Sequence, residues 1–208
     1  MGLSDQPLVD LLAAFRSSDP TPGGGSASAL GGAIGASLLA MVAGLPKPRI
    51  RTPEEDQQLV AARTRCTTIS DRLAALMDRD SAAYDGVVAA FRLPKNSEDE
   101  KAARSVRIQE ALRAATEAPL EVMRACLEAI QLAETVAAFG NTNAASDVQV
   151  GLELLGAGLR GAGMNVAINL TSLKDQADVA AMKKEMQALE REASRAHAAA
   201  IAALGERD

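Results

Sequence analysis

Residues 20–44 read PTPGGGSASALGGAIGASLLAMVAG, and this stretch decides the fold. Pro20 and Pro22 stiffen the approach, and the three glycines at 23–25 permit close contacts that a Cβ atom would prevent. Ser26 is the expected N-cap of the helix that follows, because the first amides of a helix have no partner within it. Such a loop can present bare N–H groups to an anionic or carbonyl-bearing ligand. A tight turn that leads into a packed helix explains the loop equally well.

Two common nucleotide-binding motifs are excluded by the residues around this loop. No Gly-Lys-Ser/Thr closes it, as a Walker A loop would require. No β-branched strand precedes it, as a dinucleotide-binding fingerprint would require.

The helix that follows the loop carries small residues at helical spacing. Ala27, Gly31 and Gly35 recur at every fourth position. Such stripes let a second helix approach closely, so we expect this helix at the centre of a bundle or at a subunit interface. A membrane span is the alternative, because residues 26–45 carry no charge and are long enough to cross a bilayer. The Ala/Gly/Ser-rich composition favours a buried helix, and we expect no membrane partner.

Helical signals fill the rest of the 208 residues, which are rich in Ala, Leu, Glu and Arg and contain no convincing alternating strand. Thr52 and Ser97 are expected to cap helices, Pro119 to interrupt one, and Ser146 or Asp147 to cap the next. The expected helices cover residues 7–15, 26–44, 53–91, 98–118, 119–139, 146–170 and 175–204. We therefore predict a single domain over residues 1–208, an all-α bundle of long antiparallel helices.

Composition excludes several classes of function. The net charge is −5, with no Trp and one Tyr, so neither a basic field nor a stacking platform for nucleic acid is present. Cys66 and Cys126 lack metal-site spacing, and we expect them to be reduced thiols of a cytoplasmic protein. His197 is the one histidine, in a charged terminal segment, and we expect a surface residue rather than a catalytic base or metal ligand.

One carboxylate interrupts an apolar stripe in the segment 53–91. Asp80 lies at helical spacing from the stripe formed by Leu73, Leu76, Met77, Tyr84, Val87, Val88 and Phe91. Burial would raise the pKa of its carboxyl group, as suits a general base near neutral pH. An internal salt bridge is the alternative explanation. Asp78 and Asp85 lie outside the stripe and are expected to be solvated acids.

Amide side chains form a second group of candidates. Asn165 and Asn169 lie one helical turn apart in an apolar run, where they could bind a planar heterocycle or bond another helix. Asn141 and Asp147 lie in a polar turn, residues 141–147, which capping alone would also explain.

With these residues identified, the chain resembles the cyclodeaminase/cyclohydrolase family of folate enzymes. That family includes the C-terminal domain of formiminotransferase-cyclodeaminase and stand-alone bacterial methenyltetrahydrofolate cyclohydrolases. The motifs that carry the resemblance occur in order along the chain, at residues 21–26 (TPGGGS), 80–84, 93–96 (LPKN), 109–112, 118–120, 140–141, 146–147 and 165–170. One departure is found at residues 44–49 (GLPKPR), where the family often has Gly followed by two basic residues.

The resemblance implies an all-helical homodimer with its site between helices near the glycine loop. It implies Asp80 as the catalytic base, assisted by Asp147, with no metal or other cofactor. The residues expected to contact the folate substrate are Pro22, Gly23, Gly24, Gly25, Ser26, Lys47, Tyr84, Asn141, Asn165 and Asn169. Lys47 or Arg49 would replace the family's basic pair.

The implied reaction is the reversible hydrolysis of 5,10-methenyltetrahydrofolate to 10-formyltetrahydrofolate. Its methenyl carbon is part of a cationic amidinium, so a carboxylate can attract the cation and deprotonate an attacking water. Formimidoyltetrahydrofolate cyclodeamination, which releases ammonia, is the alternative within the family. A non-catalytic helical scaffold or ligand-binding protein is the alternative from another class.

Overall fold

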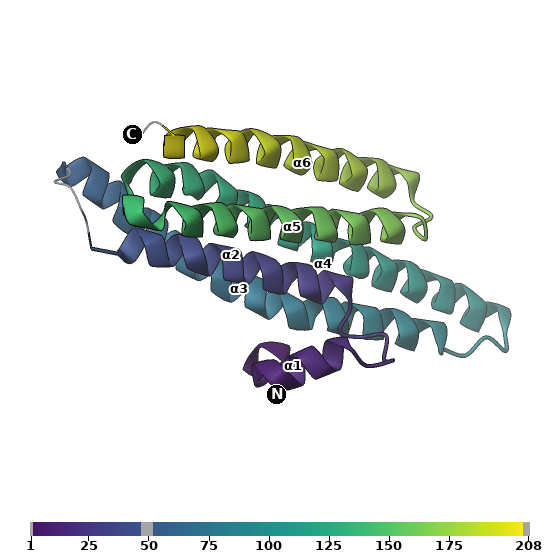
Figure 1. Cartoon of the computed structure of the whole chain (residues 1–208). Coiled ribbons are helices and arrows are strands. Elements are labelled where there is room, and N and C mark those ends of the chain that lie inside the picture. Colours follow the sequence, from purple (N-terminus) through teal and green to yellow (C-terminus); the bar gives the residue numbers. More distant parts are fainter. Residues whose placement is uncertain (1, 47–51, 206–208) are drawn as a thin grey trace.

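The computed structural model describes residues 2–46 and 52–205, which contain helices and connections but no strand (Figure 1). In chain order the elements are η1 (Leu3–Asp5), α1 (Leu8–Phe15), α2 (Gly24–Gly44), α3 (Pro53–Phe91), α4 (Glu98–Phe139), η2 (Thr142–Ala144), α5 (Ala145–Leu170) and α6 (Gln176–Gly205). The predicted all-α bundle of long helices is confirmed.

Four helices form the body of the bundle. Helix α2 packs against α3 and α5, and α4 closes the arrangement by packing against the same two helices. Helix α6 lies on the outside, against α4 and α5 (Figure 1). Arg124 of α4 holds it there by donating hydrogen bonds to both carboxylate oxygens of Glu185, at 2.6 and 3.0 Å.

The small residues of α2 serve close helix packing, as predicted. A Cβ atom at Gly35 would lie 2.6 Å from the carbonyl oxygen of Gly151 in α5. A Cβ atom at Gly158 would lie 2.7 Å from the carbonyl oxygen of Ser28. Neither clash can be relieved by moving a side chain, so glycine is required where α2 and α5 cross. Because residue numbers rise along α2 as they fall along α5, the two helices are antiparallel.

Helix α2 is also the one helix in the described ranges that is long and apolar enough to cross a membrane. In the fold it is packed against α3, α4 and α5. Its buried residues include Ala29, Ala36, Leu39 and Val42.

Two of the predicted helix starts are confirmed, and two are wrong. Thr52 and Ser97 each accept a hydrogen bond from the backbone N–H three residues on, in complete capping boxes. Helix α2 instead begins after Gly23, so Ser26 lies inside its first turn and does not cap it. Helix α5 begins at Ala145 without a side-chain cap, so neither Ser146 nor Asp147 has the predicted capping role.

Pro119 does not interrupt its helix, contrary to the prediction. Helix α4 runs unbroken from Glu98 to Phe139. A proline at 119 has no N–H to donate to the carbonyl of Ala115. The side-chain amide of Asn169 in α5 donates to that carbonyl instead, at 2.8 Å. A neighbouring helix therefore supplies the hydrogen bond that proline removes.

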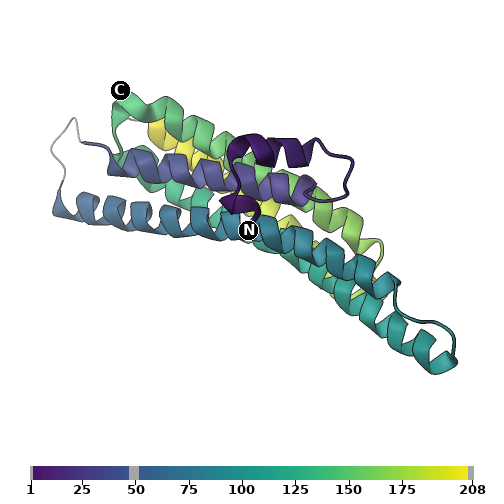
Figure 2. The same cartoon turned by 90° about the horizontal axis from the view of Figure 1, so that it is seen from below.

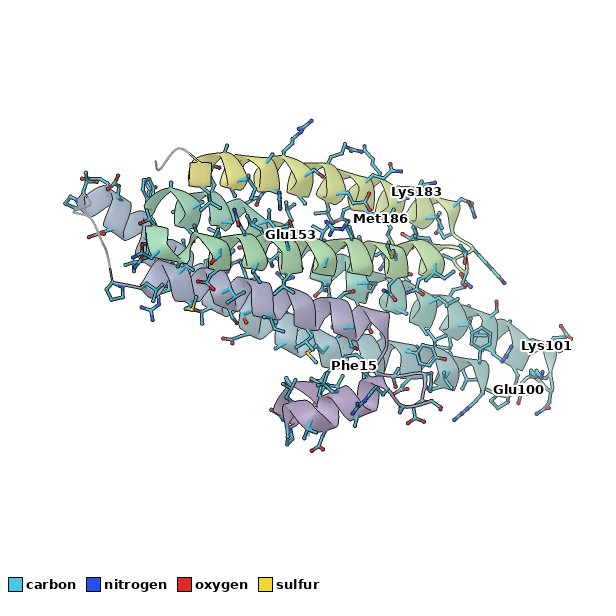
Figure 3. All side chains as sticks on the ribbon, in the orientation of Figure 1. Phe15, Glu100, Lys101, Glu153, Lys183 and Met186 are labelled. Atoms are coloured by element: carbon cyan, nitrogen blue, oxygen red, sulfur yellow. The ribbon has the colours of Figure 1, made fainter. Side chains whose placement is uncertain are left out.

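Helices α3 and α4 extend as a hairpin past the end of the bundle (Figure 2). Glu100 and Lys101 lie near its tip (Figure 3), where Lys101 pairs with Glu98 at 2.7 Å. The hairpin explains why the apolar stripe of α3 is only partly core. Leu73, Leu76 and Met77 are buried, whereas Tyr84 and Phe91 are 42% and 51% exposed. The stripe is therefore buried up to Met77, beside the first turn of α2, and at least partly exposed from Tyr84 onward.

Candidate active site

Asp80 lies against the first turn of α2. The Ser26 hydroxyl is 3.1 Å from Oδ2 of Asp80, 2.9 Å from the Met77 carbonyl oxygen and 3.2 Å from the Ser81 hydroxyl. A hydroxyl has one proton to donate, and the Ser81 hydroxyl can supply another to the same network. Ser26 is buried. Its hydroxyl group therefore fixes the orientation of the Asp80 carboxylate.

The first turn of α2 lies close to side chains from two other helices, and Gly25 is required there. A Cβ atom at Gly25 would collide with the Asp80 carboxylate, within 2.5 Å of its carbon. A Cβ atom at Gly24 would lie 3.5 Å from the amide nitrogen of Asn165. The start of α2 is therefore flanked by Asp80 from α3 and Asn165 from α5. The structure brings together five of the predicted site residues, which are Gly24, Gly25, Ser26, Asp80 and Asn165.

Two opposing effects act on the Asp80 carboxyl group. Partial burial raises its pKa above the ordinary value of an aspartate. Hydrogen bonds from the Ser26 hydroxyl and backbone N–H act in the other direction, because they stabilise the charged form. Burial is the larger effect. No cation pairs with Asp80 among the described residues, so the alternative of an internal salt bridge is not found there.

The two asparagines of α5 have different surroundings. Asn165 donates from Nδ2 to the Gly161 carbonyl in its own helix, at 2.9 Å, and its carbonyl oxygen has no partner among the described residues. Asn169 uses its amide to bond Ala115 of α4, as described above. The carbonyl oxygen of Asn165 is therefore available to a ligand beside Asp80. Asn169 instead bonds another helix, which was the alternative to ligand binding in the sequence analysis.

A second group of candidates lies at the opposite end of α2. Asn141 donates to the Pro46 carbonyl at 2.7 Å and accepts from the Asn143 N–H at 2.9 Å. Asp147 is half-buried in the first turn of α5, with no partner among the described residues. Lys47 and Arg49 lie outside the described residues. Asp147 and Asn165 are 18 positions apart on one helix, or roughly 27 Å at 1.5 Å per residue. A single chain therefore does not bring Asp147 to Asp80.

One acid near the site differs from its prediction, and the histidine lies elsewhere. Asp78 was expected to be solvated, but it is half-buried and accepts a hydrogen bond from the Leu3 N–H at 2.6 Å. It therefore anchors the N-terminal segment. The sequence around Asp78 gives no sign of this role, because its partner Leu3 is 75 residues away. His197 is half-buried on α6, with Nε2 3.5 Å from Glu153 of α5, far along the chain from this site.

The part of the chain that the structure describes contains no group of side chains suited to a metal ion. Among residues 2–46 and 52–205, no three His, Cys, Asp or Glu side chains are grouped to hold a metal ion. Cys66 and Cys126 are free and buried, and burial raises the pKa of each thiol to about 12.

The chain is similar to known proteins over most of its length. The profile of the formiminotransferase-cyclodeaminase family matches residues 7–188. The chain belongs to this family. Within it, the chain is 40% identical to a methenyltetrahydrofolate cyclohydrolase of Methylorubrum extorquens over 91% of both sequences. It is 30% identical to the formimidoyltransferase-cyclodeaminase of Sus scrofa over 92% of its own length and 35% of that protein.

The fold of this family member is also found in a crystal structure. The formiminotetrahydrofolate cyclodeaminase of Thermotoga maritima matches with a TM-score of 0.86 over 98% of both chains. The sequences are 24% identical, so this likeness supports the fold. The family resemblance identified from the sequence motifs is thereby confirmed.

Proposed function

We propose that this chain, acting as one helical domain over residues 1–208, catalyses the reversible hydrolysis of 5,10-methenyltetrahydrofolate to 10-formyltetrahydrofolate. The observation that carries the proposal is its similarity to the Methylorubrum cyclohydrolase over 91% of both sequences. The site adds a chemical reason, since it holds a half-buried carboxylate beside an open amide oxygen. A cytoplasmic location, in keeping with two free thiols, is part of the same proposal.

In the proposed mechanism Asp80 is the general base. The oxygen of a water molecule bonds to the cationic methenyl carbon as Asp80 takes one of its protons. The C–N5 bond of the resulting carbinolamine then breaks, N5 keeps the electron pair, and the hydroxyl proton ends on N5. The proton first taken by Asp80 is released to solvent. The negative carboxylate also attracts the cationic substrate, and the proposal requires no metal or other cofactor.

Cyclodeamination is the second candidate, because family members with this name are similar in sequence or fold. The chain corresponds to about a third of the pig protein. Ammonia release from formimidoyltetrahydrofolate would identify this activity. A folded protein that turned over neither substrate would leave the scaffold alternative.

We further propose that the working form is a homodimer, because the two groups of site residues lie at opposite ends of one chain. Between them runs an uncharged α2/α5 face, here defined as Leu30, Ile34, Leu38 and Met41 of α2 with Val150, Leu154, Met164 and Ile168 of α5. Ile34, Val150, Met164 and Ile168 are 45–72% exposed. An antiparallel two-fold pairing of this face would bury it and bring the Asp147 end of one chain to the Asp80 end of its partner.

Replacement of Asp80 tests the catalytic assignment. Asp80→Asn keeps the size of the side chain and removes the base, so we expect kcat to fall by about 10²- to 10⁴-fold. The measurement is the loss of the near-ultraviolet absorption of the methenyl substrate. Because burial raises the pKa of Asp80, a neutral amide is tolerated, and the thermal midpoint at neutral pH should not fall. A near-normal rate in folded Asp80→Asn protein would remove Asp80 from this role.

A further inference from the structure

A surface trough lies on α3 directly beyond Asp80. Its volume is about 570 Å³, and Pro20, Tyr84, Val88 and Arg92 are among the residues that line it. Pro20 belongs to the approach to the glycine loop, so the trough borders the same loop as the candidate active site. Tyr84 lies one helical turn after Asp80 and is 42% exposed. The trough therefore adjoins the approach to the glycine loop and begins one helical turn from Asp80. The part of α3 that carries it extends past α2 (Figure 2).

The polar and apolar groups of the trough are arranged in a sequence along the helix. Asp80, Tyr84, Val88 and Arg92 follow one another at intervals of four residues, so they form one ridge on α3. Twelve residues of helix rise roughly 18 Å. A ligand that follows this ridge from the carboxylate meets first an aromatic ring, then an apolar side chain, and last a guanidinium group.

Arg92 is available to such a ligand. Its guanidinium group has no hydrogen-bond or carboxylate partner among the described residues. Other arginines of the hairpin are occupied, since Arg79 pairs with Glu121 at 2.7 Å and Arg104 donates to the Phe91 carbonyl at 2.8 Å. Asp85 also lines the trough and opposes an anion there. The Arg92 guanidinium can bind a carboxylate through two parallel charge-assisted hydrogen bonds.

We infer that this trough binds the aromatic, anionic tail of a reduced folate, with Tyr84 against the aryl ring and Arg92 paired with the glutamate carboxylates. The inference rests on the proposed function, because it takes the folate as substrate. Such a substrate has its reactive methenyl carbon next to N10, which bears the aryl ring, and its carboxylates lie at the far end. The order of the groups along α3 matches this order.

The decisive measurement compares variants at Arg92 with substrates that differ in the tail. For Arg92→Ala we expect the KM for 5,10-methenyltetrahydrofolate to rise by about 10- to 100-fold, while kcat stays within about twofold. The KM of the wild-type enzyme should rise by the same factor when the substrate lacks glutamate, as 5,10-methenyltetrahydropteroate does. Arg92→Ala should no longer distinguish these two substrates. Arg92→Lys should lie between Ala and wild type, and Arg65→Ala, which removes an arginine elsewhere on α3, should leave KM unchanged.

A binding experiment separates this inference from the proposed reaction. Equilibrium binding of 5-formyltetrahydrofolate requires no turnover, and we expect Arg92→Ala to weaken it by the same factor. If the wild type binds in an Arg92-dependent manner but hydrolyses nothing, the reaction is wrong and the trough stands. If Arg92→Ala binds as wild type does, or if Lys47→Ala alone abolishes the preference for glutamate, the tail lies elsewhere and the inference is overturned.

Discussion

At the scale of single residues, the carboxyl group of Asp80 and the hydroxyl of Ser26 act as one unit. The hydroxyl lies 3.1 Å from the carboxylate, and the Ser26 backbone N–H bonds it as well. Both hydrogen bonds favour the charged form, which must be present for Asp80 to accept a proton. Burial favours the neutral form and has the larger effect on the pKa. Ser26 therefore extends the pH range over which Asp80 can act as a base.

Ser26→Ala should shift the acid limb of the kcat/KM profile to higher pH. Removal of the hydroxyl removes a hydrogen bond that lowers the pKa of Asp80, so the base is lost at a higher pH as the solution is acidified. We expect a shift that clearly exceeds the scatter between repeated wild-type profiles. The profile would be measured on the methenyl substrate. Ser37→Ala, in the same helix but bonded to Ser70, is the control. An unmoved limb, or one displaced to lower pH, would show that Ser26 does not tune the base.

The residues of this site could be predicted from the sequence only in part. Asp80 was selected as a candidate because a carboxylate on an apolar helical stripe is conspicuous by its spacing, and the family resemblance then implied its role as the base. The role of Ser26 was not, because its partners are more than 50 residues away and the local pattern indicated a cap. The partner of Asp78 was missed for the same reason. Spacing within a helix reports the face of a side chain, but not the neighbour that meets it.

At the scale of elements, the same limit explains the error at Pro119. The capping boxes at Thr52 and Ser97 are local, and the sequence placed those helix starts correctly. A proline inside a helix is also a local signal, and it usually ends the helix. Here Asn169, 50 positions further along the chain, supplies the hydrogen bond that Pro119 removes. Helix α4 and helix α5 are thus joined at the point where α4 would otherwise be weakest.

A double-mutant cycle at Asn169 and Pro119 should measure the contribution of the Asn169–Ala115 hydrogen bond to stability. Asn169→Ala leaves the Ala115 carbonyl without a partner, so we expect the free energy of unfolding to fall by about 1–3 kcal/mol in urea titrations. In a Pro119→Ala background, residue 119 has its own N–H to donate to Ala115, and the same Asn169→Ala change should cost less than half as much. Equal costs in both backgrounds would contradict the structural role. A large loss of kcat without loss of stability would instead return Asn169 to the substrate site.

At the scale of the whole molecule, the long helices separate two groups of residues that the family resemblance assigns to one site. Asp80 and Asn165 lie at one end of the α2/α5 face, and Asn141 and Asp147 lie at the other. The helix α1 has Leu11 as its one buried residue, while Leu8, Val9 and Leu12 are 47–67% exposed. Phe15 lies where α1 meets the bundle (Figure 3). An incomplete site and uncovered apolar surface are both accounted for if a second copy of the chain packs here.

A mixed dimer distinguishes a composite site from a site within one chain. Asp80→Asn and Asp147→Asn homodimers should both be inactive if each site takes Asp80 from one chain and Asp147 from its partner. A heterodimer of the two variants, purified through two different tags, would then contain one intact site and one doubly altered site. Its activity should be about half that of the wild-type dimer. With sites built within one chain, each site of the heterodimer would carry one substitution, and no activity would return. Normal activity of the Asp147→Asn homodimer would exclude Asp147 from the site, because a required partner residue cannot be replaced without loss.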